Sequence, residues 1–355
     1  MRIVFLCSEM AAYYFTCFKK LLETEDLHVL LVHWPAIKDA PYQFESISGL
    51  TIFDKSEFED SVLAKVVYDF QPDVLYVSGW NDKLYLQIAR QLKPRALVIA
   101  GLDTQWKGTL KQHVASFISP FYLKRFFDVF WVPGKRQVFF AKRMGYSGKR
   151  CWEGLLTCDV DAYNSAGQRK SDRKNSFLYV GRYSPEKGID VLAEAYLNYR
   201  QSVSEPWDLH CVGAGSYKPE KIDSPFIQQH EFIQPEKMPA FIADHKCLVL
   251  PSLSDAWGLV IHEAAATGLP VICTSACGAV DHLVEQGRNG WIIKPGSPEQ
   301  LTNAMLDMHK LSTEQWSVMS QESRKLSLQY SPAKWVQTLM KGIQEFNWEN
   351  KTAKR

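Results

Sequence analysis

Two cations, Arg182 and Lys187, stand where a predicted strand passes into a predicted helix. The apolar run Phe177–Val180 ends at Gly181, Arg182 follows directly, and Lys187 with Gly188 opens the helix. Arginine offers a planar fork to a phosphate and lysine a point charge, and the free N–H groups of a helix start favour anions. The pattern predicts that Arg182 and Lys187 grip a diphosphate. The alternative is that both are solvated turn residues.

Two carboxylates, Asp255 and Glu263, follow a second predicted strand at Cys247–Leu250. We expect a helix from about 258 to 267, ended by Gly268. Over a mostly helical stretch the carboxylates would lie ~12 Å apart, at ~1.5 Å per residue. One could then meet the hydroxyls of a sugar and the other those of a ribose. A capping Asp and a salt-bridged helix Glu are the alternative, which the apolar surroundings of Glu263 weaken because an unpaired carboxylate there is costly.

Short apolar runs alternate with helix-length amphipathic stretches along the whole chain, which is typical of parallel α/β sheets. The pattern predicts an α/β fold of two doubly wound Rossmann-like domains with an interdomain cleft, where ligands bind at the carboxyl edges of the strands. The expected strands are Ile3–Cys7, His28–His33, Leu50–Phe53, Val74–Ser78, Ala96–Ala100, Val129–Val132, Phe177–Val180, Leu209–Val212, Ile227–Phe232, Cys247–Leu250, Val271–Thr274 and Trp291–Ile293. The expected helices between the first of these are Phe58–Phe70 and Lys83–Leu92.

The domain boundary is expected near the middle of the chain. Residues 1–160 form the predicted first domain and residues 177–330 the second. The segment 161–176 is interpreted as a linker, because residues 164–176 are polar and contain no apolar run. Residues 331–355 are expected to form a terminal helix that begins with Pro332 in its first turn.

Composition places the protein among ordinary soluble globular proteins. Its 355 residues are 46% hydrophobic and 23% charged, with a net charge of +2. The eight cysteines include no CxxC pair and no zinc spacing, so we expect reduced core thiols in a cytoplasmic protein. The N-terminus has too few consecutive apolar residues for a signal peptide, and no run has the ~18 apolar residues of a membrane-spanning helix.

Several spaced motifs together resemble the retaining glycosyltransferases of family 4, which have the GT-B fold. They are Gly181-Arg182 followed by Lys187-Gly188 with a spacing of five residues from Arg182 to Lys187, Asp255-Ala-Trp-Gly258 with Glu263-Ala264, Gly268-Leu-Pro-Val-Ile, Val212-Gly213-x-Gly215, Gly278, and Gly287-x-Asn289-Gly290. The resemblance covers residues 176–305 closely and the first domain only in its strand–helix rhythm. It also implies that the terminal helix of residues 331–355 crosses back onto the first domain.

The resemblance implies a hexosyltransferase that uses a nucleotide sugar. Arg182 and Lys187 would bind the diphosphate and stabilise the leaving nucleotide, Glu263 the ribose, the backbone of Phe232–Ile233 the base, and Asp255 the transferred sugar. It also assigns donor contacts to Gly181, Gly213, Trp257, Gly258, Leu259 and Val260. The family usually has Glu where this chain has Asp255, so the reach of this carboxylate differs.

The resemblance further implies transfer with retention, without a metal ion or other cofactor. The leaving phosphate is commonly described there as helping to deprotonate the acceptor. The D-x-D sequence of the chain is Asp159-Val160-Asp161, which we interpret as interdomain structure rather than a metal site.

In the first domain, Asp103 follows the predicted strand Ala96–Ala100. At a carboxyl edge it could orient or deprotonate an acceptor hydroxyl, so it is a candidate catalytic residue beside Asp255, Arg182 and Lys187. The alternative is a helix N-cap. Residues 80–82 hold the analogous place after the preceding strand, and the aromatic loop Ser8–Tyr14 suggests stacking of an acceptor.

The segment Lys107–Arg150 combines ten Lys or Arg with a single acid, Asp128, and interleaves eight bulky apolar residues. A basic face beside an apolar face predicts contact with an anionic membrane surface. Ordinary solvated lysines are the alternative, and nothing else in the chain supports nucleic acid.

The leading hypothesis is a retaining glycosyltransferase acting on a glycan or a polyprenyl- or other lipid-linked acceptor. Bacterial cell-surface polysaccharide or lipopolysaccharide biosynthesis is the setting that the resemblance implies, with the protein peripheral on the inner face of the membrane. The alternatives are a non-catalytic nucleotide-sugar binding protein, or a sugar epimerase or phosphorylase of the same fold.

Overall fold

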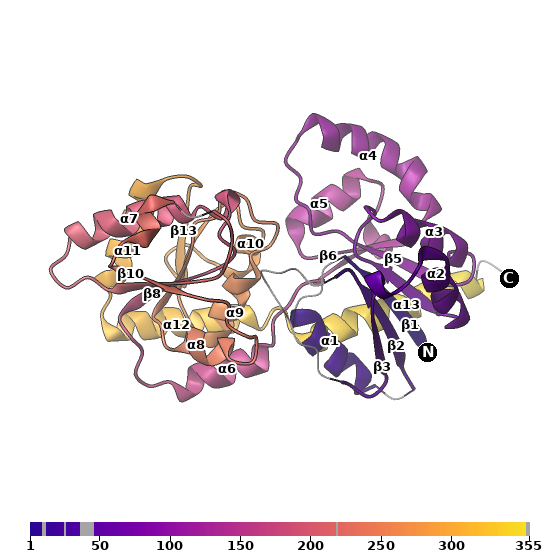
Figure 1. The fold of residues 1–355 in the computed structure, drawn as a ribbon, viewed down its shortest axis with the longest axis horizontal. Coiled ribbons are helices and arrows are strands. Elements are labelled where there is room, and N and C mark those ends of the chain that lie inside the picture. The colour runs from indigo at the N-terminus through magenta and orange to yellow at the C-terminus, as the bar shows by residue number, and fades with distance from the viewer. Residues whose placement is uncertain (9–11, 25, 36–45, 218, 353–355) are drawn as a thin grey trace. The chain divides into compact units, whose positions relative to one another are not determined.

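The computed structural model describes residues 1–8, 12–24, 26–35, 46–217 and 219–352 (Figure 1). These residues divide into two compact units. The first unit comprises Met1–Leu156 together with Pro332–Arg355, and the second comprises Thr157–Ser331.

A parallel sheet of seven strands forms the centre of the first unit, in the order β3-β2-β1-β4-β5-β6-β7. Its strands are β1 (Arg2–Cys7), β2 (His28–His33), β3 (Leu50–Asp54), β4 (Val74–Val77), β5 (Leu97–Gly101), β6 (Val129–Val132) and β7 (Cys151–Glu153). Its helices are α1 (Ala12–Leu22), α2 (Asp60–Asp69), α3 (Lys83–Leu92), α4 (Leu110–Tyr122), α5 (Lys135–Arg143) and α13 (Pro332–Thr352). The six expected strands are confirmed. The three-residue strand β7 was too short to show as an apolar run.

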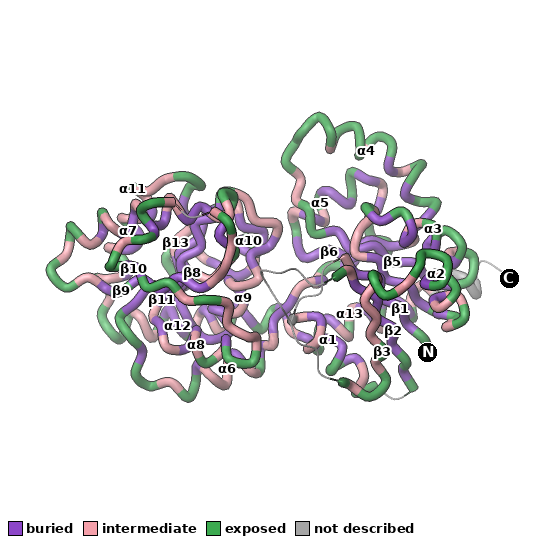
Figure 2. Tube along the Cα trace, viewed as in Figure 1, coloured by how far each residue is buried: buried purple, intermediate pink, exposed green. Residues whose placement is uncertain are grey.

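Both faces of this sheet are buried, as near-continuous apolar strands require. Along β1, Val4 and Leu6 enter one apolar cluster, while Ile3 and Phe5 enter another on the opposite face. Successive side chains of a strand point to opposite faces, so one short run supplies both cores. Figure 2 shows the strands as buried segments beneath the exposed outer faces of the helices.

The second unit contains a parallel sheet of six strands in the order β10-β9-β8-β11-β12-β13. Its strands are β8 (Ser176–Val180), β9 (Asp208–Val212), β10 (Ile227–His230), β11 (Cys247–Leu250), β12 (Val271–Thr274) and β13 (Gly290–Ile293). Its helices are α6 (Val160–Arg169), α7 (Ile189–Gln201), α8 (Met238–Ala243), α9 (Leu259–Thr267), α10 (Val280–Leu283), α11 (Pro298–His309) and α12 (Thr313–Ser327). All six expected strands are present, although β10 ends at His230, two residues before its predicted end.

The predicted linker 161–176 is wrong over most of its length. Residues 160–169 form α6, which packs against α8 and α9 within the second unit. Asp159 begins this helix by accepting a hydrogen bond from the Ala162 N–H. The segment lacks an apolar run because only Val160, Tyr163 and Gly167 of α6 are buried, too few for a periodic signal.

Helix α13 belongs to the first unit, although it follows the second unit in the sequence. Trp335 is buried there among Trp131, Phe5 and Phe18, and its indole N–H donates to the Leu155 carbonyl. Farther along the helix, a Cβ on Gly342 would lie 2.2 Å from the ring of Trp152. Aromatic packing therefore ties α13 to β6, β7 and β1.

All eight cysteines are free, and seven of them are buried. Burial raises the pKa of the Cys7, Cys211 and Cys247 thiols far above the ordinary value, so these thiols serve as small core residues. Within the described ranges, no helix is both long and apolar enough to cross a bilayer.

Candidate functional site

The candidate residues of the second unit follow four neighbouring strands of one parallel sheet. Gly181 and Arg182 come after β8, Gly213 after β9, Phe232 and Ile233 after β10, and Asp255 after β11. Because parallel strands all point the same way, the loops that carry these residues lie along one edge of the sheet.

An ion pair joins two of these loops. The Lys187 ammonium donates to Asp255 Oδ2 at 2.6 Å, and their side chains are only 19% and 9% exposed. Asp255 also accepts longer hydrogen bonds, from Ser252 Oγ and from the Trp257 N–H, each at 3.4 Å. Two of the residues predicted to act on the donor thus contact each other, which the sequence did not indicate.

Backbone contacts hold the same two loops together. Leu253 N–H donates to the Glu186 carbonyl at 2.8 Å. Gly188 has φ +65°, begins α7, and lies so near that a Cβ would sit 2.3 Å from the Pro251 carbonyl oxygen. Lys187 is therefore placed against Asp255 by rigid backbone, since only glycine fits at position 188.

The third loop, which follows β12, is attached to the second by further hydrogen bonds. Thr274 Oγ1 donates to the Ser252 carbonyl, the Gly278 N–H to the Asp255 carbonyl and the Ala279 N–H to the Trp257 carbonyl. Gly278 is buried beneath this contact. The backbone of residues 252–257 is thus fixed from both sides.

Close packing between two loops accounts for the glycine at position 213. It has φ +146°, and a Cβ would lie 2.0 Å from the Gly181 carbonyl oxygen. The close approach of the loops after β8 and β9 requires glycine there whether or not a ligand binds, so a donor contact at Gly213 stays a prediction.

Helix α9 lies between two left-handed glycines, as expected. Gly258, with φ +83°, begins it and Gly268, with φ +86°, ends it by donating to the Ala264 carbonyl. Most of the helix is buried, whereas Leu259, Val260 and Glu263 remain partly exposed. Glu263 lies four residues after Leu259 and three after Val260, and residues at these spacings share a helix face, so these three predicted donor residues line the accessible edge of α9.

Glu263 is held in an apolar setting beside Tyr163 of α6. Burial raises the pKa of the Glu263 carboxyl to about 7, and a hydrogen bond with the Tyr163 side chain opposes that rise. Tyr163 was missed by sequence reasoning because it lies in the segment interpreted as a linker. The available signal was that Tyr163 is the one aromatic residue in the polar segment 161–176.

The neighbours of Glu263 on α9 are anchored inside the unit. His262 is fully buried, accepts from the Cys158 N–H and contacts the Ser327 carbonyl through Nε2. Burial lowers the pKa of His262 to about 4, so this imidazole is neutral and donates to Ser327. It connects the chain before α6 and the end of α12 to the helix that carries Glu263.

Four further residues predicted to contact the donor differ in how far they are exposed. The Trp257 side chain is 3% exposed and packs against His282 and Tyr330, so it supports the loop rather than facing outward. Arg182 is exposed, and Phe232 is partly exposed in the loop after β10. Ile233 shares the partial exposure of Phe232.

Asp103 of the first unit lies at a pocket of about 300 Å³. Ser78, Trp80 and Asn81, which follow β4, line the pocket from one side. Gln137 fixes the Asp103 backbone by donating to its carbonyl at 2.8 Å, and the Asp103 side chain is exposed. The alternative of a helix N-cap is wrong, because Thr109 caps α4.

Two other first-unit candidates have structural roles. Asp82 caps α3 and accepts from Lys55 at 2.5 Å and from the Trp34 indole. The predicted stacking loop Ser8–Tyr14 falls partly outside the described residues. Within it, Tyr14 is buried on α1 and its hydroxyl contacts that of Tyr76 at 3.1 Å, so Tyr14 belongs to the core.

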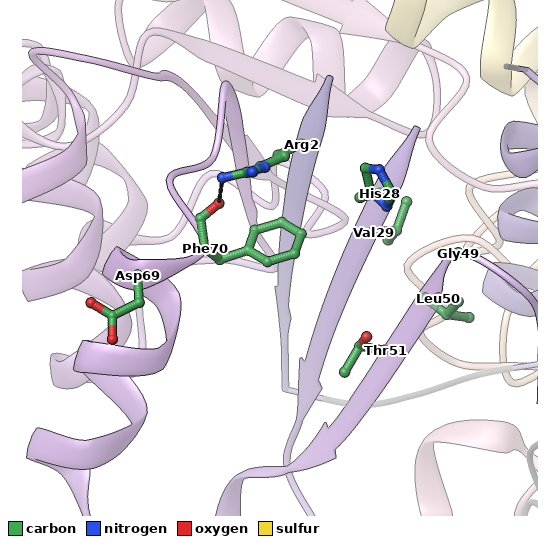
Figure 3. A pocket seen from close by; sticks show the side chains of 8 residues that line it. All are labelled: Arg2, His28, Val29, Gly49, Leu50, Thr51, Asp69 and Phe70. Carbon is green, nitrogen blue, oxygen red and sulfur yellow. Dashed lines mark hydrogen bonds between the residues drawn. The ribbon is translucent and has the colours of Figure 1, made fainter. Parts of the chain in front are cut away.

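A second pocket of the first unit lies at the opposite edge of its sheet (Figure 3). Arg2, His28 and Leu50, the first residues of β1, β2 and β3, line it, and Arg2 donates to the Phe70 carbonyl. Ligands of open α/β sheets bind at the carboxyl ends of the strands, so this pocket is not a candidate site.

The segment Asp159–Asp161 is structural at its first residue, since Asp159 caps α6. Over the part of the chain that the structure describes, no three His, Cys, Asp or Glu side chains are grouped so that they could hold a metal ion.

Part of the second unit is similar to a known protein family. Residues 174–310 match the family Glycosyl transferases group 1. An uncharacterized glycosyltransferase of Methanocaldococcus jannaschii is 26% identical over 182 residues, which cover 49% of each chain. The lipopolysaccharide glucosyltransferase WaaG of Escherichia coli is 28% identical over 140 residues, 38% of this chain and 37% of that protein. The chain therefore spans half or less of the length of these relatives.

Solved structures match nearly the whole chain. HepE from Anabaena, in complex with UDP, superposes with a TM-score of 0.72 at 15% identity, covering 97% of this chain and 100% of that one. A glycosyltransferase from Rickettsia africae has a TM-score of 0.72 at 13% identity, with coverages of 97% and 98%. The fold is GT-B, with two Rossmann-like units, and residues 174–310 of the second unit are similar to the Glycosyl transferases group 1 family.

The raised pKa of Glu263 predicts a pH-dependent stability. The unfolded carboxyl ionises near its ordinary value of 4.5 and the folded one only near 7. As the pH rises between these values the unfolded chain loses its proton first, so stability falls and stays lower above pH 7. Glu263→Gln removes this loss, and we expect it to raise the free energy of unfolding by about 1–3 kcal/mol at pH 8 and by little at pH 4.5.

Thermal unfolding of the ligand-free protein across this pH range measures the effect. Exposed Glu220 supplies the control variant Glu220→Gln, which should follow the wild type at every pH. Identical curves for Glu263→Gln and the wild type at pH 8 would contradict the assignment.

Proposed function

We propose that this protein transfers a hexose-type sugar, with retention, from a nucleotide-sugar donor to a glycan or lipid-linked acceptor. The observation that carries the proposal is the ion pair of Lys187 with Asp255, whose lysine lies in the loop that also carries Arg182, within the residues that match Glycosyl transferases group 1. Solved structures of HepE, which has this fold, contain UDP or UDP-glucose.

Lys187 and Arg182 are proposed to hold the donor diphosphate. Lys187 is fixed by Asp255 and by the contact of its loop with Pro251, whereas Arg182 is exposed and close to Lys187 in the same loop. A positioned ammonium costs little reorganisation as negative charge develops on the leaving phosphate. Arg182 adds a planar fork that closes on the phosphate oxygens when the donor binds.

Asp255 has two roles in the proposal. It orients the Lys187 ammonium through Oδ2, and through Oδ1 it meets a hydroxyl of the transferred sugar. An aspartate reaches less far than a glutamate by one methylene, which keeps its carboxylate on the lysine. The sugar hydroxyl must therefore approach the 252–257 loop closely, beside the Gly258 end of α9.

Glu263 is proposed to accept hydrogen bonds from the ribose hydroxyls, with Leu259 and Val260 contacting the donor along the same edge of α9. The loop at Phe232 and Ile233 would contact the base. Binding of the donor hydroxyls to Glu263 stabilises its carboxylate form, which its apolar surroundings disfavour.

In the proposed reaction the bond between the anomeric carbon and the donor phosphate oxygen breaks as the acceptor oxygen bonds to the same face of that carbon. The acceptor proton passes to the leaving phosphate, and Lys187 and Arg182 balance the charge of the nucleoside diphosphate. Asp103 of the first unit is proposed to orient the acceptor hydroxyl. No metal ion is required in this scheme.

The biological setting is part of the proposal. A relative of the second unit is named as a lipopolysaccharide glucosyltransferase of Escherichia coli. This supports a role in bacterial cell-surface polysaccharide biosynthesis, carried out by a cytoplasmic protein at the inner face of the membrane.

A non-catalytic nucleotide-sugar binding protein is the second candidate, since Asp255 is engaged by Lys187 in the free protein. An epimerase or phosphorylase of the same fold is the third. Slow hydrolysis of the donor by the purified protein favours a transferase over a binder, because water then replaces the acceptor.

Lys187→Ala tests the diphosphate site. We expect it to weaken donor binding by about 10- to 100-fold, since a hydrogen bond from a charged group is lost and Asp255 is left without its cation. The measurement is the ligand-induced rise in melting temperature over a series of UDP-, GDP-, dTDP- and ADP-sugars, which also identifies the base. Exposed Lys310 of the same unit supplies the control Lys310→Ala, and an equal loss in both variants would contradict the assignment.

Asp103→Asn separates acceptor handling from donor binding. We expect donor-induced stabilisation to stay at the wild-type level and the rate of transfer to fall by about 10²-fold or more, because the acceptor hydroxyl is no longer held in the reactive orientation. The matched variant Asp69→Asn changes an exposed aspartate of the same unit away from the pocket. Transfer near the wild-type rate in Asp103→Asn would discard the role.

Removal of divalent cations tests the metal-free reaction. Full activity after treatment with EDTA is expected, because the two cations of the chain supply the charge that a metal would otherwise supply. Loss of transfer that returns on addition of Mg²⁺ or Mn²⁺ would show that the scheme is wrong.

A further inference from the structure

Helix α4 of the first unit carries an apolar stripe that faces outward. Leu110, Phe117 and Phe121 are 86%, 80% and 76% exposed, and Val114 and Ile118 are more than half exposed. Their spacing of three and four residues places them on one face of the helix. Figure 2 draws α4 mostly as exposed, in contrast to the strands below it.

The opposite face of α4 is the one attached to the unit, and it is made of small and polar residues. Ser119 is buried and donates through Oγ to the Met144 carbonyl at 3.0 Å. Pro120 packs against Gly145, where a Cβ would lie 3.3 Å from its ring. Gln112 donates to the Gln105 carbonyl at 2.7 Å. The helix is thus oriented against the usual pattern, in which the apolar face is buried.

Helix α5 lies beside α4 (Figure 1), and its Phe139 is a further large apolar residue that is half exposed. Arg143 of the same helix stacks on Phe139 and on Trp106, with its guanidinium carbon 5.7 Å and 4.3 Å from the ring centres. We call the exposed apolar residues of α4 together with Phe139 the α4 face.

Basic residues surround the α4 face. Lys107 and Lys111 stand at the start of α4, Lys124 and Arg125 just after its end, and Lys142 on α5, and all five are exposed. From Lys107 to Arg150 the single acid is Asp128. Asp128 points elsewhere, since it pairs with Lys93 and accepts from the Val98 N–H. A large apolar patch within a rim of one charge marks an interaction site.

We propose that the α4 face docks on the surface of an anionic lipid bilayer, with its apolar stripe in the headgroup region and its basic rim on the lipid phosphates. An amphipathic helix of this kind lies in the plane of the interface. Apolar burial and attraction to anionic lipid act together, and neither alone gives firm attachment.

The same helix also lines the candidate acceptor pocket. Lys111, Gln112 and Ala115 of α4 line that pocket together with Asp103 and Trp80. A bilayer on the outer side of α4 would hold lipid headgroups within one helix diameter of the pocket. The inference therefore deepens the proposed function, on which this step rests, by naming a lipid-borne molecule as the acceptor.

A second copy of this chain is disfavoured as the partner. A twofold contact would bring each basic rim against an identical rim, and like charges buried across an interface oppose association. An anionic surface instead complements the rim at every point.

The experiment is co-flotation of the full-length protein with vesicles of phosphatidylcholine alone and of phosphatidylcholine mixed with phosphatidylglycerol. We expect binding to the anionic vesicles that weakens as salt is added. Phe117→Ser with Phe121→Ser should lower the partition coefficient roughly tenfold or more by removing exposed apolar area. Lys124→Glu with Arg125→Glu should lower it by about fivefold for each cation lost, or more.

Matched variants outside the α4 face provide the controls. Val318→Ser with Leu328→Ser removes two apolar residues of similar exposure in the second unit, and Lys65→Glu with Lys341→Glu reverses two exposed charges of the first unit. Both controls should bind vesicles like the wild type.

Three outcomes would overturn the inference. They are no binding of the wild type to anionic vesicles at low salt, binding that the two Phe substitutions leave unchanged, and self-association in light scattering that the Phe substitutions abolish. Donor-induced stabilisation measured without vesicles reports on the proposed function separately. Failure of docking with intact donor binding therefore rejects the α4 proposal alone, and the reverse result rejects the transferase alone.

Discussion

The ion pair between Lys187 and Asp255 is the interaction on which the candidate site depends. It joins the loop after β8 to the loop after β11 at 2.6 Å, in a place where both side chains are largely shielded from water. Breaking one partner of such a pair leaves a poorly solvated charge, which is costly. Gly188 and the hydrogen bond from Leu253 hold these two backbones together, and the Gly278 N–H fixes the second of them from the loop after β12. The charge that would grip a phosphate is thus positioned before any ligand arrives.

Helix α9 couples this pair to the rest of the second unit. Its buried side is held by His262, which is neutral and bonded at both ring nitrogens. Its open side presents Glu263, which the apolar surroundings disfavour as a charge and Tyr163 partly supports. Binding sites commonly retain a group that destabilises the free protein, because ligand binding offsets its free-energy cost. The segment around Tyr163 therefore supports a candidate site residue, although its composition resembles a linker.

The first unit shows the same separation of roles on α4. Its small and polar side is used for internal packing, as with Ser119 and Pro120. Its apolar side is left to solvent, as with Phe117 and Phe121. A folded unit that leaves this much apolar area exposed gives up burial that would stabilise it. The orientation of α4 is consequently the strongest sign of a partner outside the unit.

Most strands of this protein and both ends of α9 could be predicted from the sequence alone. Period-two and apolar runs located twelve of the thirteen strands, and glycines located both ends of α9, because these signals depend on neighbours in the chain. The spaced motifs of residues 181–268 likewise indicated a nucleotide-sugar site. Only tertiary structure decided which side chains meet. The pairing of Lys187 with Asp255, the support of Glu263 by Tyr163 and the outward face of α4 all depend on residues far apart in the chain. The membership of α13 in the first unit was predicted, but only through the family resemblance. Composition carries no record of such contacts, since the same helix can pack on either face until its neighbours are in place.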